Sequence, residues 1–181
     1  RSECEWAFEI PNTSVDEMHR VGAFGCINGT VTLLDFFEVN LVGTIPPEIG
    51  YLRGLRFLGF WYNALTGLIP SSIGLLKDLE HLYFDYNILS GTLPSELGQL
   101  SKIDLFDAEN NFLTGSIPSE LGLLQSVRAI WLDHNALSGS IPSSIFGGES
   151  LLRIELQYNS FTGSVPSEIG LMSKTTESIQ L

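Results

Sequence analysis

The sequence predicts a right-handed repeat solenoid of the α/β class, with a concave parallel β-sheet and short 3-10 or irregular segments on the convex side. Two observations predict this fold. One pattern recurs in phase every 24 residues along most of the chain, and each unit contains a short alternating apolar segment. Each unit then places asparagine, glycine and proline at fixed positions, which turn the chain toward the next coil.

Six consecutive units define the expected domain organisation. They begin at Val31, Leu55, Leu79, Ile103, Val127 and Leu151. We therefore expect an N-terminal cap over residues 1–30, six repeats over residues 31–174, and the start of a truncated seventh repeat over residues 175–181. The seventh unit matches only if one residue is inserted, so that Ile179 and Leu181 become its inward pair. We expect the native protein to continue beyond Leu181, because ending there would leave apolar core open to water.

The unit that begins at Leu79 shows why each element is expected. Leu82 and Phe84 alternate with residues expected to face outward, which predicts a short strand with these two side chains inward. An asparagine follows at the same phase in five units, where its amide can satisfy turn backbone groups that lack regular partners. These residues are Asn63, Asn87, Asn111, Asn135 and Asn159.

Glycine and proline set the return path of each coil. A glycine at residues 43, 67, 91, 115, 139 and 163 permits a tight turn in which a side chain would clash or require positive φ. The pair Leu93-Pro94 and its equivalents predict an extended segment before a short helical turn. The pair Leu97-Gly98 and its equivalents are expected to end that turn.

These residues resemble the pattern LxxLxLxxNxLxGxIPxxLGxL of plant leucine-rich-repeat proteins, over about five-sixths of the chain. That family includes the ectodomains of receptor kinases, receptor-like proteins and polygalacturonase inhibitors. The segment containing Cys4, Trp6 and Gly25-Cys26 is similar, at longer spacing, to the CxWxGVxC cap of the family. The resemblance implies an extracellular recognition domain.

The cap segment also indicates the cellular compartment. Cys4 and Cys26 are the only cysteines and both precede the first repeat, which favours one disulfide over a metal site with four ligands. Asn12 and Asn28 begin two glycosylation sequons in the same segment. Together these features predict an extracellular or cell-surface protein that passes through the secretory pathway.

Composition and charge restrict the partners. The chain is 44% hydrophobic and 17% charged, which is typical of a globular domain. Its formal net charge of −12 disfavours nucleic acid, because a phosphate backbone would be repelled. No apolar run is long enough to span a bilayer, so membrane attachment is expected only through a missing C-terminal part.

The candidate ligand-binding site is the concave face, where residues flanking the inward pairs are expected to point to solvent. Exposed Trp and Tyr are typical anchors of interfaces, and the surrounding acids favour a protein or peptide with basic groups. A glycan remains possible, because sugars stack on aromatic rings and hydrogen-bond to carboxylates. The predicted binding residues are Phe37, Trp61, Tyr62, Tyr83, Asp85, Tyr86, Asp107, Glu109, Trp131, Asp133, His134, Glu155 and Tyr158.

Other interpretations stay open. The aromatic stacks could serve only to stabilise the sheet, and the acids could serve only solubility. The domain could belong to a membrane receptor, a secreted inhibitor or recognition protein, or a structural subunit for adhesion or assembly. Ice binding would require flat ranks of Thr or Asn, which the concave columns lack, although Ser and Thr occur on the convex side.

An enzymatic function is not expected. Asp107 with Glu109, or Asp85 with Asp133, could form an acid and base pair, but only their proximity suggests it. No nucleophile motif, phosphate loop or dinucleotide fingerprint is present, so no cofactor is predicted. The histidines lack the partners of a metal site.

Overall fold

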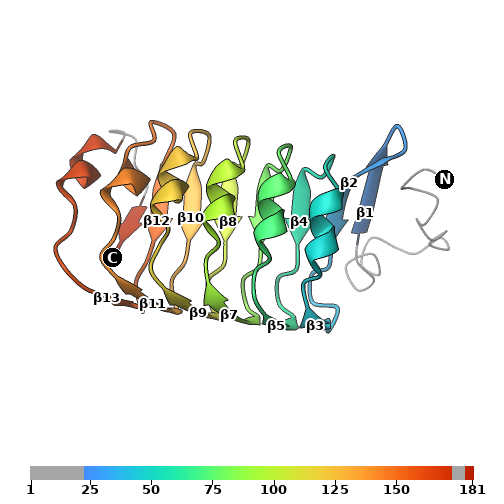
Figure 1. Ribbon diagram of the computed structural model, residues 1–181, viewed down its shortest axis with the longest axis horizontal. Coiled ribbons are helices and arrows are strands. Elements are labelled where there is room, and N and C mark those ends of the chain that lie inside the picture. The colour runs from blue at the N-terminus through green and yellow to red at the C-terminus, as the bar shows by residue number, and fades with distance from the viewer. Residues whose placement is uncertain (1–22, 173–177) are drawn as a thin grey trace.

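The computed structural model describes residues 23–172 and 178–181 and confirms the leucine-rich-repeat solenoid. Successive coils stack side by side, and each contributes one strand to a main sheet and one 3-10 helix to the opposite side (Figure 1). A second sheet runs along the lower edge of that view. The described residues contain no helix that is long and apolar enough to cross a bilayer.

The main sheet has eight strands in the order β1-β2-β4-β6-β8-β10-β12-β14. Its strands are β1 (Ala23–Ile27), β2 (Thr30–Asp35), β4 (Phe57–Gly59), β6 (His81–Tyr83), β8 (Leu105–Asp107), β10 (Ala129–Trp131), β12 (Arg153–Glu155) and β14 (Ser178–Gln180). β1 and β2 are antiparallel, and the later neighbours pair in parallel. Leu82 pairs with Phe106, 24 residues on, whereas Ile154 pairs with Ile179, so the inserted residue predicted before β14 is present.

A second, six-stranded parallel sheet was not predicted. Its strands are β3 (Val42–Thr44), β5 (Ala64–Gly67), β7 (Ile88–Thr92), β9 (Phe112–Gly115), β11 (Ala136–Gly139) and β13 (Ser160–Phe161). The four strands β5, β7, β9 and β11 each contribute one deeply buried residue, such as Leu89, and an exposed residue such as Ile88 can precede it. One inward residue is too short an alternation to indicate a strand, and only the next coil supplies its backbone partners.

The convex side consists of short 3-10 helices, as predicted. They are η2 (Pro47–Tyr51), η3 (Ser71–Leu75), η4 (Ser95–Gln99), η5 (Ser119–Leu123), η6 (Ser143–Phe146) and η7 (Ser167–Leu171). A proline in extended conformation precedes each of η2 to η6, and Pro166 precedes η7. The fixed φ of proline therefore sets where each helix begins.

The role predicted for the Leu-Gly pair is wrong. η4 continues to Gln99, past Gly98, so this glycine does not end the helix. A Cβ on Gly98 would lie 2.2 Å from the Glu120 carbonyl oxygen of the next coil. Glycine is therefore needed because adjacent 3-10 helices approach closely. The earlier turn glycines do have the predicted positive φ, for example 75° at Gly91.

The core is formed by the predicted inward side chains. Leu82 and Phe84 are both fully buried, and their equivalents in the neighbouring coils are buried beside them. The rings of Phe36, Phe60 and Phe84 stack along the solenoid axis, with centroids 5.6 and 6.1 Å apart. Leu181, predicted to face inward, is instead 46% exposed, because it follows β14 and no described coil covers it.

The asparagine ladder is confirmed. The Asn87 side-chain oxygen accepts a hydrogen bond from the Leu65 backbone N–H at 3.0 Å. Its amide donates to the carbonyls of Phe60 at 2.8 Å and Phe84 at 3.0 Å. Because Leu65 and Phe60 belong to the preceding coil, each asparagine satisfies turn backbone groups and joins two coils.

The described part of the cap is a hairpin. Asn28 and Gly29 have φ values of 51° and 82° and form the turn between β1 and β2, as Asn-Gly pairs favour. Cys26 on β1 is disulfide-bonded, and Asn28 is exposed. Cys4 and Asn12, the other predicted modification sites, lie outside the described residues.

Candidate functional site

The parallel register brings the predicted binding residues together on one face. Tyr83, Asp107, Trp131 and Glu155 lie at matching positions of β6, β8, β10 and β12. The other predicted residues follow the main-sheet strands, in the turn that leads to the second sheet. Their side chains form an aromatic cluster, an acidic cluster and a third group near β12.

The aromatic cluster comprises Phe37, Trp61, Tyr62, Tyr83 and Tyr86. The Trp61 ring lies 4.7 Å from Phe37 and 5.4 Å from Tyr83 between centroids, and Tyr62 stacks on Tyr86 at 4.2 Å. The Trp61 indole N–H donates to Asp35 Oδ1 at 3.0 Å. Such ring pairs stabilise neighbouring strands as well as offering contact area to a ligand.

The predicted exposure of these aromatics is only partly correct. Tyr62 and Tyr86 are exposed, at 45% and 39%, but Trp61 and Tyr83 are half-buried. Rings on adjacent coils cover one another because neighbouring strands lie only about 5 Å apart. Phe57, which we did not predict as a site residue, extends the cluster, with its ring centroid 5.5 Å from that of Tyr83. The position of Phe57 on β4, paired with His81 on β6, could have indicated that it belongs to the cluster.

The acidic cluster comprises Asp85, Asp107, Glu109 and Asp133. We predicted these acids to be solvent-exposed, but Asp85 is 4% exposed and Asp133 is 3% exposed. Neighbouring coils lie only about 5 Å apart and cover these two side chains, whereas Asp107 and Glu109 are half-buried. Asp107 Oδ1 accepts a hydrogen bond from the Glu109 backbone N–H at 3.0 Å.

Burial raises the pKa of three of these carboxyls. The pKa of Asp85 rises to about 6, chiefly through desolvation. Desolvation and then the Asp85 charge raise the pKa of Asp107 to about 8. Desolvation and then the Asp133 charge raise the pKa of Glu109 to about 7. The cluster therefore holds protons near neutral pH, because each added negative charge lies in a poorly solvated site beside others.

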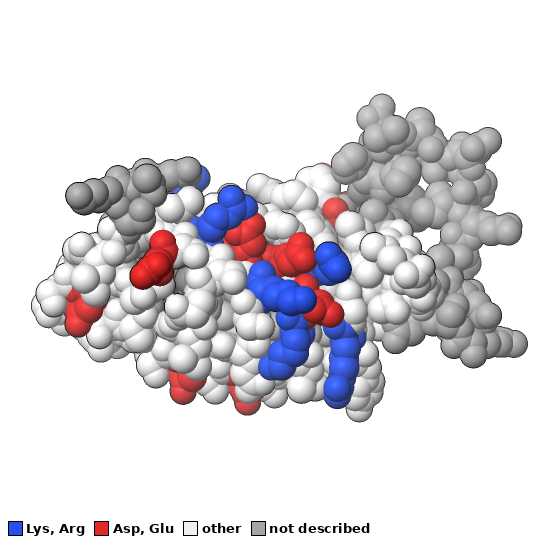
Figure 2. All heavy atoms as spheres, turned by 90° about the horizontal axis from the view of Figure 1, so that it is seen from above, with Lys and Arg blue, Asp and Glu red and all other residues white. Residues whose placement is uncertain are grey.

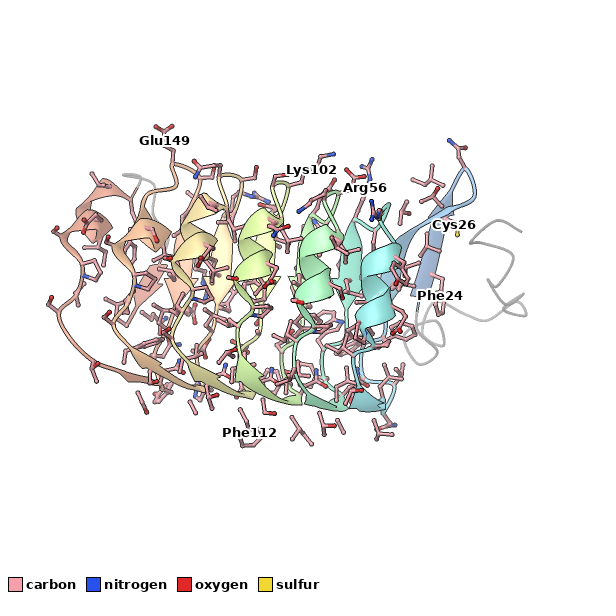
Figure 3. All side chains as sticks on the ribbon, in the orientation of Figure 1. Phe24, Cys26, Arg56, Lys102, Phe112 and Glu149 are labelled. Atoms are coloured by element: carbon pink, nitrogen blue, oxygen red, sulfur yellow. The ribbon has the colours of Figure 1, made fainter. Side chains whose placement is uncertain are left out.

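Lys and Arg side chains gather along the upper edge of the solenoid, interspersed with acids (Figure 2). Arg56 and Lys102 point outward from that edge, at the top of Figure 3. Lys102 pairs with Asp78 at 2.6 Å and lowers its pKa.

Two further pairs on this edge follow the same pattern. Arg56 pairs with Glu80 at 3.5 Å, and Arg128 pairs with Asp104 and lowers its pKa. These pairs join acids and bases of neighbouring coils at the edge. In the part of the chain that the structure describes, no Lys or Arg forms a salt bridge with the concave acidic cluster.

The third group lies toward the C-terminal end of the sheet. Glu155, also predicted to be exposed, is 7% exposed and pairs with Arg153 at 2.5 Å. The Arg153 guanidinium lies 5.5 Å from the centre of the Trp131 ring, which is half-buried. Glu155 therefore has a partner in its own strand, which makes it a poorer ligand contact than the acidic cluster.

A shallow pocket borders the acidic cluster. It has a volume of about 460 Å³ and is lined by Tyr86, Asn87, Asn110, Asn111, Phe112 and His134. The Asn110 amide donates to Glu109 Oε1 at 3.3 Å, and His134 Nδ1 lies 2.7 Å from Asp133 Oδ2. The pocket walls are thus hydrogen-bonded to two of the four carboxyls. Tyr158, which is 71% exposed, packs on His134 with ring centroids 4.2 Å apart.

Changing Asp107 to asparagine is expected to stabilise the protein at alkaline pH by about 1–3 kcal/mol, after discounting the pKa shift for solvent screening. The native carboxyl keeps its proton up to about pH 8, whereas the unfolded one loses it near 4. The free energy of unfolding therefore falls progressively as pH rises from about 4 to about 8. Urea unfolding at about pH 4 and about pH 8.5 checks this, since the variant should gain stability only at the higher pH.

The control is Glu149→Gln, which removes an exposed acid at the upper edge (Figure 3). It should change stability by less than about 0.5 kcal/mol at both values of pH. If Asp107→Asn instead changes stability equally at both pH values, the folded state does not raise the pKa of Asp107.

Comparison with known proteins places the chain among repeat proteins. The leucine-rich-repeat family model matches residues 78–100, which include β6, β7 and η4. No curated protein sequence matches the chain significantly. The crystal structure of PEPR1–AtPEP1 is similar, with a TM-score of 0.84 and 31% identity, covering 87% of this chain and 22% of that chain.

Two further solved structures are similar over most of the chain. The plant peptide hormone receptor RGFR1, in complex with RGF2, has a TM-score of 0.71 and 35% identity, covering 78% of this chain and 26% of that chain. A plant ice-binding protein has a TM-score of 0.71 and 33% identity, covering 82% of this chain and 49% of that chain. The chain thus spans less than half the length of each of these three proteins. RGFR1 is described as a receptor, and the third protein is described as ice-binding. The coil geometry, the asparagine ladder and these similarities show that the chain belongs to the plant-type leucine-rich-repeat proteins.

Proposed function

We propose that the chain is a recognition domain whose concave face binds a protein or peptide segment with exposed Lys or Arg side chains. One observation carries this proposal: stacked aromatic rings lie beside an acidic cluster that is partly buried and forms no salt bridge with Lys or Arg among the described residues. Aromatic side chains supply contact area at little entropic cost, and the acids favour a cationic partner.

The exposed rings are the proposed anchors. Tyr62, Tyr86, His134 and Tyr158 are open to a ligand, whereas Phe37, Trp61, Tyr83 and Trp131 form a half-buried floor. The similar receptor RGFR1 binds RGF2, which supports recognition of a peptide or protein. A glycan is the competing ligand on the same rings.

The place of action is part of the proposal. A disulfide at Cys26, the exposed sequon residue Asn28 and the similarity to plant receptors support an extracellular or cell-surface location. A membrane receptor is the form these similarities favour. A secreted inhibitor and an adhesion or assembly subunit would use the same concave face without a membrane anchor.

Changing Tyr86 to alanine is expected to weaken peptide binding about 30-fold, because truncation of an interface tyrosine typically costs about 2 kcal/mol. Random peptides displayed on phage would be selected on the immobilised chain, and their affinities measured by fluorescence titration. The selected peptides should be enriched in Lys and Arg. Tyr86→Ala is a cleaner test than Trp61→Ala, since Trp61 also packs on Phe37 and hydrogen-bonds to Asp35.

The matched control is Tyr51→Ala, which removes a 72% exposed tyrosine from η2 on the convex side. It should leave peptide affinity unchanged. Equal losses in the two variants, or selected peptides without excess basic residues, would contradict the proposal. Binding of neutral oligosaccharides that depends on Tyr86 would assign the face to glycans instead.

Ice binding is a second candidate function, supported by the similar plant ice-binding protein and by the second sheet. Exposed Thr44, Thr66, Thr92 and Thr114 recur along that sheet, although the exposed apolar residues Leu68, Ile88 and Phe112 interrupt its surface. Phe112 points away from the lower edge in Figure 3. An assay of ice recrystallisation separates the two functions, since Thr92→Tyr should abolish an ice activity and leave peptide binding intact.

A further inference from the structure

Three successive coils place an acid at the same point of the concave face. Asp85, Glu109 and Asp133 occupy equivalent positions after β6, β8 and β10, and Asp107 lies on β8 beside them. Adjacent strands are about 5 Å apart, so these carboxyls lie within direct electrostatic reach of one another. The charges of Asp85, Glu109 and Asp133 each act on Asp107.

Two oxygens of this cluster have unused hydrogen-bonding capacity. Asp85 Oδ1 and Asp133 Oδ1 are buried, and neither accepts a hydrogen bond from the described residues. Their residues are only 4% and 3% exposed. A buried carboxylate oxygen without a donor costs on the order of 1–3 kcal/mol, more when it is charged. The site is therefore complementary to a donor that also carries positive charge.

A positively charged donor is not supplied by the described surroundings. Glu109 and Asp133 share a hydrogen bond, but only while one of these two carboxyls holds a proton. Outside the cluster, the described side chains that interact with the four carboxyls are Tyr83, Tyr86, Asn110 and His134. Of these, His134 is the group that can become positive, and its Nδ1 lies 2.7 Å from the other oxygen of Asp133.

The remaining cationic groups on the neighbouring strands interact with other acids. On β6, the charge of His81 acts on Asp104, and the buried Nδ1 of His81 has no hydrogen-bond partner among the described residues. On β12, Arg153 is paired with Glu155. The missing donor is thus expected from a bound molecule.

The form of the site favours an organic cation over a metal ion. No group of three or more His, Cys, Asp or Glu side chains within the described ranges has the arrangement needed to hold a metal. The pocket beside the cluster instead has aromatic walls, Tyr86 and His134, on either side of Asn110. Planar guanidinium groups and ammonium groups bind favourably over aromatic faces near carboxylates.

We infer that Asp85, Asp107, Glu109 and Asp133 form the binding site for one cationic side chain, a Lys ammonium or an Arg guanidinium, of the molecule recognised by the concave face. This inference rests on the proposed function and adds which residues select the cation. The alkyl part of that side chain would lie along the pocket wall formed by Tyr86 and Phe112.

Binding at this site releases protons. A cation stabilises the ionised carboxyls, so it lowers pKa values that burial has raised to about 6, 8 and 7 for Asp85, Asp107 and Glu109. Affinity should therefore rise with pH between about 5.5 and 8.5. An exposed acidic surface with ordinary pKa values would not show this dependence in the same range.

The test uses n-butylammonium and n-butylguanidinium as probes of the 181-residue chain. Carbon-detected NMR follows the side-chain carboxyl signals during titration at constant ionic strength, with NaCl as the reference salt. At about pH 8.5 the four cluster carboxyls should shift saturably with an organic cation and not with NaCl, and at about pH 5 the response should disappear. The probe with the higher affinity identifies Lys or Arg as the preferred side chain.

The variant Asp85→Asn/Asp107→Asn should abolish the saturable shifts and weaken selected basic peptides by about 30-fold or more. The control Glu120→Gln removes an exposed acid of η5 and should change neither measurement. A response to Ca²⁺ that is stronger than to both organic cations would overturn the inference in favour of a metal site. Shifts equal to those produced by NaCl would overturn it as well.

The two levels of the proposal fail separately. If basic peptides bind through Tyr86 while the cluster carboxyls do not respond to the probes, recognition by the concave face stands and the cation site is wrong. If the carboxyls respond but no basic peptide binds, the cation site exists and the proposed peptide recognition is wrong.

Discussion

Replacing Gly98 by alanine is expected to lower the free energy of unfolding by about 3 kcal/mol, at the upper end of the usual cost of overpacking. The added Cβ would lie 2.2 Å from the Glu120 carbonyl oxygen and 2.7 Å from its carbonyl carbon. These are backbone atoms, which cannot move aside by rotating a side chain. Relief would require η4 and η5 to separate, and that separation would loosen the core between two coils.

Thermal unfolding measures this effect, and a fall in Tm of about 6–12 °C is expected for a chain of this size. Gly170→Ala is the matched control, because it makes the same change at the equivalent position of η7, where no described atom lies within 4 Å of the added Cβ. That variant should lie within about 0.5 kcal/mol of the parent. Similar losses in both variants would show that close approach of the coils is not the reason for glycine.

Changing Asn111 to leucine is expected to cost about 4 kcal/mol, because it leaves buried backbone groups without partners. Asn111 Oδ1 accepts from the Leu89 N–H at 3.0 Å, and its amide donates to the Phe84 carbonyl at 2.9 Å. The side chain is almost fully buried, so water cannot replace these bonds. Leucine preserves the volume and removes every polar contact, which isolates the hydrogen bonds as the cause.

In urea denaturation, Asn111→Leu should unfold at a lower urea concentration than the parent. The dependence of the unfolding free energy on urea should stay similar, because the variant exposes about the same surface area on unfolding. Gln125→Leu is the control, because it removes an exposed amide that donates to the Gly122 carbonyl on the convex side. Its effect should stay within about 0.5 kcal/mol. An unchanged midpoint for Asn111→Leu would refute the asparagine ladder as a source of stability.

The repeat pattern predicted the fold because each framework position has one physical role. Leu82 and Phe84 alternate with outward residues, so their burial followed from the period of a strand. Asn87 could be assigned to the turn because an amide both donates and accepts. The second sheet escaped prediction because its strands bury at most one residue each, such as Leu89, and their hydrogen-bond partners come from other coils.

The repeat pattern predicts which residues follow each main-sheet strand, but it does not predict how far each side chain is buried. Tyr86 and Asp85 both follow β6, as their phase in the repeat indicates. Their sequence positions look alike, yet Tyr86 is 39% exposed and Asp85 is 4% exposed. Glu155 and Asp133 also hold similar places in the repeat, but Glu155 forms a salt bridge with Arg153, whereas Asp133 contacts His134. A repeat position does not reveal which neighbouring rings cover a side chain.

The sequence by itself determined the coil, its inward residues, its turn asparagines and the acidic and aromatic character of one face, because these follow from local periodicity and residue chemistry. Only the tertiary structure decided that Gly98 serves coil packing, that Trp61 is partly buried, and that four acids share one poorly solvated site. Each of these depends on the distance between residues about 24 positions apart. Stacking of successive coils sets that distance, and with it the burial, the pKa values and the proposed cation site.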